Sequence, residues 1–122
     1  MTRTDRAVRR ASHHLVTNEA LIASAFGLEV DGRRRQVLLL TDRRVLLVGF
    51  RGERPIELSR EDCAAEYDTV GRVLTVRQGD GEIQIRDVAG DVAARLITLL
   101  RRHRSTLGGR TSHLGHVRLL QD

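Results

Sequence analysis

Arginine is the residue type through which this chain is best equipped to bind another molecule. The 122-residue sequence contains 21 basic residues, all of them arginine, and three stand in a row at Arg33, Arg34 and Arg35. Arg51 and Arg54 form a second, looser group. Because the planar guanidinium pairs with two oxygens of a phosphate or carboxylate at once, these five residues are candidate anion-binding residues. The alternative is that arginine fills solvent-exposed positions in a chain encoded by a GC-rich genome.

The other reactive side chains predict neither a metal site nor catalysis. His13 and His14 are adjacent, so on a helix they point about 100° apart and cannot easily share a metal ion. His113 and His116 are better spaced, but their surroundings supply at most one further ligand, and metal sites need three or four. Cys63 is the only cysteine, which excludes an internal disulfide, and we expect it to face the core. No nucleophile elbow, paired carboxylates or glycine-rich phosphate loop is present, so we expect no enzyme activity, no cofactor and no small-molecule substrate.

The net charge of +5 is distributed unevenly along the chain. Residues 1–18 carry +3, residues 95–122 carry +5 and residues 32–56 carry +5, whereas residues 19–31 carry −3 and residues 57–94 carry −5. The high pI suggests a polyanion-binding protein, but the acidic segments make part of the domain negative. Opposite charges on two halves also predict that the basic face can dock on the acidic face of a second copy at low salt.

The hydrophobic pattern predicts a mainly β structure between two helices. Residues 4–15 are predicted to form a helix with Thr4 as its cap, and residues 88–104 an amphipathic helix with Asp87 as its cap. Between them, residues 20–86 divide into short apolar or alternating runs separated by turn residues. We therefore predict a meander of about seven antiparallel strands, curled into a small barrel with the second helix over one opening.

The four polar residues at 41–44 interrupt the most apolar stretch of the chain. They determine whether this stretch is predicted to be a helix or two strands. The apolar runs on either side have the length of strands. A helix would place Asp42 and the two arginines after it on successive sides of a buried cylinder, at a high desolvation cost. We therefore predict a hairpin turn with Thr41, Asp42 and Arg44 as its structural residues. In this turn the Asp42 side chain is expected to accept a hydrogen bond from a backbone N–H two residues on.

The predicted meander also determines which loops lie together. Successive turns of an up-and-down meander lie at alternate ends of the strands. The turn at residues 31–35 and the turn at residues 51–54 therefore share one end, while residues 43–44 lie at the other. This arrangement predicts that the five candidate arginines converge on one rim of the barrel.

Two stretches of the sequence resemble bacterial pleckstrin-homology-like (PH-like) domains of the YokE-type and GRAM-like group. They are VLLLTDRRVLLVG at residues 37–49 and IELSREDCAAEYDTVGRVLTVRQGDGEIQIRDV at residues 56–88. The shared features are an acidic residue that opens the first strand, here Glu19, a Thr-Asp-x-Arg motif at 41–44, and a glycine-turned hairpin before a helix. The resemblance covers roughly residues 16–104.

The resemblance implies a seven-stranded, partly open antiparallel barrel capped by a C-terminal helix, which binds or targets without catalysis. Eukaryotic phosphoinositide-binding relatives usually carry lysines, and a tryptophan in the last helix, and this chain has neither. The expected organisation is a basic N-terminal helix in residues 1–18, a PH-like domain in residues 19–104 and a flexible basic tail in residues 105–122.

Two functions agree with these features. The first is a non-enzymatic interaction or targeting module that binds a protein or peptide partner, with assembly into a homo-oligomer as one form. The second is an electrostatic adaptor whose arginine rim and basic termini bind an anionic phospholipid surface or a nucleic acid. The scarcity of aromatic residues counts against stacking recognition of single strands. No apolar run is long enough to cross a membrane, so we expect a cytoplasmic protein, attached peripherally to a membrane in one version of the second function.

Overall fold

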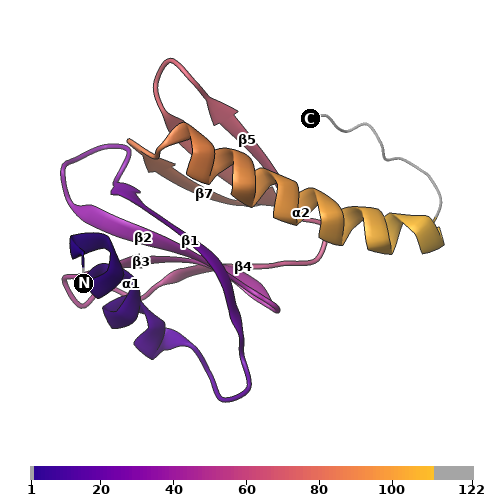
Figure 1. Ribbon diagram of the computed structural model, residues 1–122, viewed down its shortest axis with the longest axis horizontal. Coiled ribbons are helices and arrows are strands. Elements are labelled where there is room, and N and C mark those ends of the chain that lie inside the picture. Colours follow the sequence, from indigo (N-terminus) through magenta and orange to yellow (C-terminus); the bar gives the residue numbers. More distant parts are fainter. Residues whose placement is uncertain (1, 112–122) are drawn as a thin grey trace.

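The protein forms one antiparallel sheet of seven strands with a helix on either side of it (Figure 1). The computed structural model describes the backbone of residues 2–111 and the side chains of residues 2–102. The strands are β1 (Leu21–Leu28), β2 (Arg35–Thr41), β3 (Arg44–Gly49), β4 (Ile56–Ser59), β5 (Ala64–Asp68), β6 (Val73–Gln78) and β7 (Gly81–Arg86). The helices are α1 (Arg3–Ala11), the short 3₁₀ helix η1 (Ser12–His14) and α2 (Gly90–Thr111).

The sheet curls without closing. Its strand order is β4-β3-β2-β1-β7-β6-β5, so that β4 and β5 form the two edges. The two halves of the sheet join where β1 pairs with β7, through Leu28 and Arg86. The predicted seven-stranded, partly open antiparallel barrel with a C-terminal helix and a short N-terminal helix is therefore confirmed.

Strand β2 is buried on both of its faces, which explains its unbroken apolar sequence. Leu38 and Leu40 point into the main core, which α2 covers. Val37 and Leu39 point to the opposite face, where they join Ala11 of α1 in a second core. A strand that is covered on both sides has a continuous apolar sequence instead of an alternating one. Helix α1 is therefore packed as part of the same domain and does not form a separate N-terminal unit.

The predicted turn at residues 41–44 is confirmed, but its hydrogen bonds differ from those expected. The buried Thr41 hydroxyl accepts hydrogen bonds from the backbone N–H groups of Arg43 (3.1 Å) and Arg44 (3.0 Å). The prediction that Asp42 would accept such a bond was wrong. Its carboxylate instead accepts a hydrogen bond from the backbone N–H of Ala20, at 3.0 Å, because the chain just before β1 runs beside the turn.

The helix boundaries also differ from the predicted ones. Thr2, not Thr4, caps α1, in a capping box with Asp5. Asp87 does not cap α2: it adopts a φ of 61° and pairs with Arg72 at 3.1 Å, and the helix begins at Gly90. Helix α2 extends through Thr111, past the predicted end at residue 104. The rest of the predicted tail, residues 112–122, lies outside the described residues.

Glycine at position 27 is required where the two halves of the sheet meet. A Cβ atom there would press on the carbonyl oxygen of Arg86 and lie 2.8 Å from Cγ1 of Ile85. We expect Gly27→Ala to lower the free energy of unfolding by about 1–3 kcal/mol, because backbone must shift to relieve the overlap. Urea unfolding measures this change. Gly90→Ala is the matched control, since its Cβ would meet only Tyr67, at 4.0 Å, and should have little effect.

Candidate functional site

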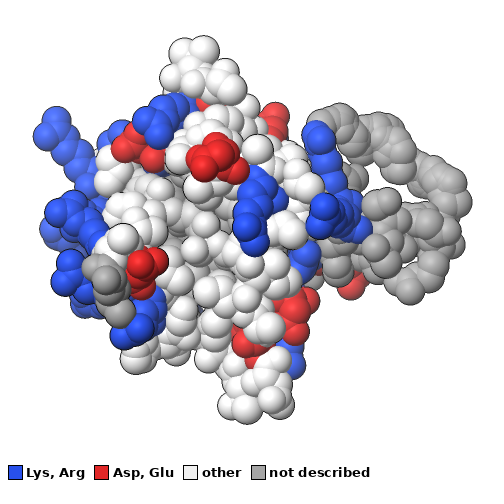
Figure 2. Space-filling view, viewed as in Figure 1, with Lys and Arg blue, Asp and Glu red and all other residues white. Residues whose placement is uncertain are grey.

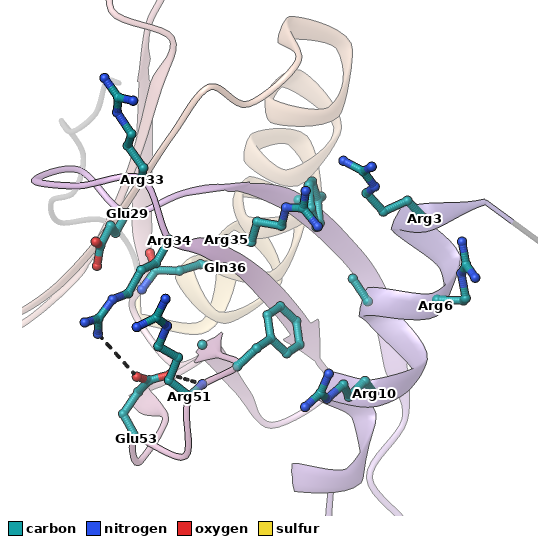
Figure 3. A pocket seen from close by; sticks show the side chains of 14 residues that line it. Arg3, Arg6, Arg10, Glu29, Arg33, Arg34, Arg35, Gln36, Arg51 and Glu53 are labelled. Carbon is teal, nitrogen blue, oxygen red and sulfur yellow. Dashed lines mark hydrogen bonds and ion pairs between the residues drawn. The ribbon is translucent and has the colours of Figure 1, made fainter.

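A groove of about 840 Å³ lies between α1 and the loops that follow β1 and β3 (Figure 3). We call it the arginine groove. The residues that line it are Arg3, Arg6, Ala7, Arg10, Phe26, Glu29, Arg33, Arg34, Arg35, Gln36, Gly49, Phe50, Arg51 and Glu53. Seven of these carry a guanidinium and two carry a carboxylate. The groove therefore gathers a third of the basic residues of the chain in one concavity.

The predicted convergence of the loop arginines holds for four of the five residues. Arg33, Arg34 and Arg35 lie in or next to the β1–β2 loop, and Arg51 lies in the β3–β4 loop. Arg54 belongs to the same loop as Arg51 but follows the turn at Gly52 and is not among the residues that line the groove.

Sequence reasoning missed the other wall of the groove. Arg3, Arg6 and Arg10 of α1 line the groove on the side opposite the loop arginines, and Arg3 and Arg10 point toward the loops (Figure 3). Their i, i+3 and i+7 spacing places them on one side of a helix, and this signal was available in the sequence. What the spacing did not show is where α1 packs. The side of the molecule that carries α1 is also the side where basic residues gather in Figure 2.

Small apolar residues determine how α1 packs. Ala11 is fully buried, and Ala7 and Val8 pack against the same cluster on the outer face of β2 and β3. Alanine on this face lets the helix lie close to the strands, so the arginines on its neighbouring face reach the groove. The guanidinium of Arg10 lies 5.5 Å from the centre of the Phe50 ring, which is within cation–π range.

The β1–β2 loop that carries three groove arginines is held in place by hydrogen bonds. Arg86, at the end of β7, donates to the backbone carbonyl oxygens of Glu29 (3.0 Å) and Gly32. Within the loop, the N–H of Glu29 donates to the carbonyl oxygen of Arg34 at 2.9 Å. Hydrogen bonds therefore hold the backbone that carries the loop arginines in place. This reduces the conformational entropy that the loop loses when it binds a ligand.

Positive charge in the groove is mostly unbalanced by the protein itself. Glu53 accepts a hydrogen bond from the backbone N–H of Arg51 and lies 4.0 Å from Arg34, in a solvent-exposed pair that contributes little. No other groove arginine forms an ion pair with a residue that the structure describes. Because several guanidinium groups share one concavity, the field there attracts anions.

Arginine at position 44 has a structural role at the opposite end of the strands. Its Nε and Nη2 donate to the two carboxylate oxygens of Glu19, both at 2.8 Å, and the Glu19 side chain is fully buried. The Thr41 hydroxyl donates to the same carboxylate at 2.7 Å. The Arg44 guanidinium, together with the Thr41 hydroxyl and the Val16 N–H, lowers the pKa of Glu19 to about 2, although burial acts in the opposite direction. Thr41 and Arg44 therefore hold the Glu19 carboxylate at this turn, and Asp42 binds the backbone that precedes β1.

The acidic half of the chain is partly neutralised by its own arginines. On β5, β6 and β7, Arg77 bridges Glu66 and Glu82 across the outer face of the sheet. These residues are exposed, and the network contains one cation for two anions. Of the seven arginines in the basic segment 32–56, four line the groove, whereas Glu66 and Glu82 of the acidic segment lie on an exposed face.

The histidines and the cysteine, the other candidate residues, form no site in the part of the chain that is described. His13 and His14 are exposed in η1, and no group of three or more His, Cys, Asp or Glu residues among the described ones could hold a metal ion. His113 and His116 lie outside the described residues. Cys63 is buried as predicted. In the described residues, no helix has both the length and the apolar character needed to span a membrane.

The arginine groove can bind an anion through several guanidinium groups at once, and it presents two aromatic rings beside them. Its lining includes neither histidine nor cysteine. Family models give no match to the chain, and neither curated proteins nor solved structures match it.

Proposed function

We propose that this protein is a non-enzymatic, PH-like binding module that recognises an anionic partner in the arginine groove. The observation that carries the proposal is the convergence of seven arginines from three separate segments on one concavity with only two carboxylates. A surface on which arginine merely fills exposed positions would spread these charges. The observed seven-stranded, partly open barrel is also the architecture that the PH-like resemblance implies.

Some arginines outside the groove, unlike most of those that line it, are paired with carboxylates. Arg44 and Arg77 are neutralised by carboxylates within the fold. The groove arginines, Arg34 excepted, have no such partner among the described residues. Folding alone does not explain why like charges are held close together, since their mutual repulsion costs stability. A ligand that neutralises them recovers this cost on binding.

A protein or peptide partner remains a second candidate for the same groove. Carboxylates pair with guanidinium groups as phosphates do, so an acidic peptide satisfies the charge requirement. Phosphates and sulfates carry a higher charge density, so a groove with seven arginines fits them better. Titration with polyglutamate beside heparin and polyphosphate separates the two candidates.

The test compares groove arginines with neighbours that lie outside the groove. We expect Arg6→Ala/Arg10→Ala to weaken heparin binding about tenfold and to lower the salt dependence of the affinity by about two ions. Arg9→Ala, on the same helix but not lining the groove, is the matched control. In the β3–β4 loop, Arg51→Ala should weaken binding and Arg54→Ala should not.

Isothermal titration calorimetry at several salt concentrations measures both quantities. If Arg9 and Arg54 variants lose as much affinity as the groove variants, the binding is a diffuse charge effect and the proposal is wrong. Absence of any anion binding by the wild-type chain at low salt would contradict it as well.

A further inference from the structure

Aromatic residues are rare in this chain, yet two of the three lie in the arginine groove. Phe26 comes from β1 and Phe50 from the residue after β3. Both are half-buried, so part of each ring stays accessible from the groove. The third aromatic residue, Tyr67, is on β5 and donates its hydroxyl hydrogen bond to the carbonyl oxygen of Val88. A purely electrostatic site for phosphate or sulfate has no need of aromatic rings.

The ring of Phe50 is paired with a guanidinium. Arg10 lies over it at 5.5 Å from the ring centre. A phenyl ring and a planar guanidinium are the two side-chain surfaces on which nucleic-acid bases stack. The groove therefore combines groups that bind phosphates with groups that bind the faces of bases.

The arginines on α1 form a row. Arg3 and Arg10 are seven residues apart on one side of the helix, which corresponds to about 10 Å along its axis, with Arg6 between them. A row of this length matches a ligand that carries several phosphates in line. A single phosphate group would occupy only one part of it.

The concave shape of the arginine groove favours some polyanions over others as its ligand. In a duplex the bases are stacked inside, so none is available to stack on the aromatic rings that line the groove. A flat bilayer cannot reach both walls of a groove. An unpaired strand can enter the groove and present phosphates and base faces together.

We infer that the anionic partner is a single-stranded nucleic acid, whose phosphates pair with the groove arginines and whose bases stack on Phe26 and Phe50. The inference rests on the proposed function and adds the class of ligand. It also reverses the expectation from composition, because two of the three aromatic residues line the groove as well as packing on the second core.

The first experiment uses the wild-type full chain and needs no variant. Fluorescence anisotropy measures binding to labelled DNA and RNA single strands of about 12 nucleotides, a length within the range that single-strand-binding proteins cover. The competitors are the matched duplex, an abasic strand of equal length and charge, and vesicles of anionic phospholipid. We expect the single strand to bind at least tenfold more tightly than the abasic strand and the duplex.

The second experiment removes the rings and keeps the charge. Phe26→Leu/Phe50→Leu retains apolar volume in the outer core, and its melting temperature is recorded as a check on folding. We expect single-strand affinity to fall roughly tenfold to a hundredfold, and heparin affinity to fall by much less. Tyr67→Phe, which leaves the groove intact, should bind as the wild type does.

The outcomes separate the inference from the function on which it rests. If the abasic strand or the vesicles bind as tightly as the single strand, the arginine groove binds anions but the inference about single strands is wrong. If the double phenylalanine variant is folded and binds the single strand normally, stacking is likewise excluded. If neither strands nor heparin bind, the proposed function itself fails.

Discussion

Replacing Leu96 by alanine is expected to lower the free energy of unfolding by about 2–5 kcal/mol. Leu96 is 2% exposed and lies on the face of α2 that closes the main core. The helix brings Leu100 and Ala93 to the same face. Truncating Leu96 removes apolar contact and leaves a cavity that the surrounding strands cannot fill without shifting.

Urea unfolding followed by circular dichroism measures this loss. Arg95→Ala is the matched control, because Arg95 is the exposed neighbour on the same helix and its replacement should change stability little. A Leu96→Ala variant with the stability of the wild type would mean that α2 does not pack on the sheet in solution. Since domains of this size are stable by only about 5–15 kcal/mol, the loss is a large fraction of the total.

The second large effect is expected at the buried ion pair between Glu19 and Arg44. Replacing Arg44 by methionine should lower the free energy of unfolding by about 3–5 kcal/mol at neutral pH, because a buried carboxylate is left without its countercharge. The Glu19 side chain has no exposed surface, so its carboxylate depends on the partners that the fold provides. The variant also loses the hydrogen bond from Arg44 to the carbonyl oxygen of His14, at 3.0 Å, which links η1 to β3.

Arg43→Met is the control for this substitution. Arg43 is the exposed neighbour in the same turn. We expect it to change stability by less than about 0.5 kcal/mol. Equal effects of the two substitutions would show that the Glu19 pair contributes nothing specific.

The same pair predicts how stability depends on pH. The pKa of Glu19 falls from 4.5 to about 2 on folding, so the unfolded chain binds the proton more tightly. The contribution of the ionised carboxylate is therefore fully present above about pH 4.5 and is lost as the pH falls towards 2. We expect the stability gap between the wild type and Arg44→Met to narrow over this range. Urea midpoints measured from neutral pH to about pH 3 test it, and a constant gap would contradict this assignment.

Much of the fold could be predicted from the sequence because the signals are local. The polar residues at 41–44 between two apolar runs, and the Gly-Asp-Gly turn at 79–81, determine hairpins within a few residues. Alternation over Ile83 and Ile85 and the helical spacing of Leu96 and Leu100 show which faces are buried. Successive hairpin turns also lie at alternate ends of the strands. The proximity of the two loops that carry arginines could therefore be predicted from strand order alone.

The other half of the arginine groove depended on the tertiary structure. The sequence shows that α1 is basic and amphipathic, but any exposed apolar surface could have received its apolar face. Only packing decides that Ala11 is buried against Val37 and Leu39. That contact carries Arg3, Arg6 and Arg10 to the groove.

The partner of the buried Glu19 carboxylate and the shared location of the two phenylalanine rings also depended on the tertiary structure. Glu19 and Arg44 are 25 residues apart. Phe26 lies on β1 and Phe50 follows β3, so no spacing in the sequence links either pair. Local patterns determine turns, strands and faces because they depend on interactions between residues that are near in the chain. The meeting of side chains from distant segments is decided only by how the elements pack, since many partners satisfy the same local pattern.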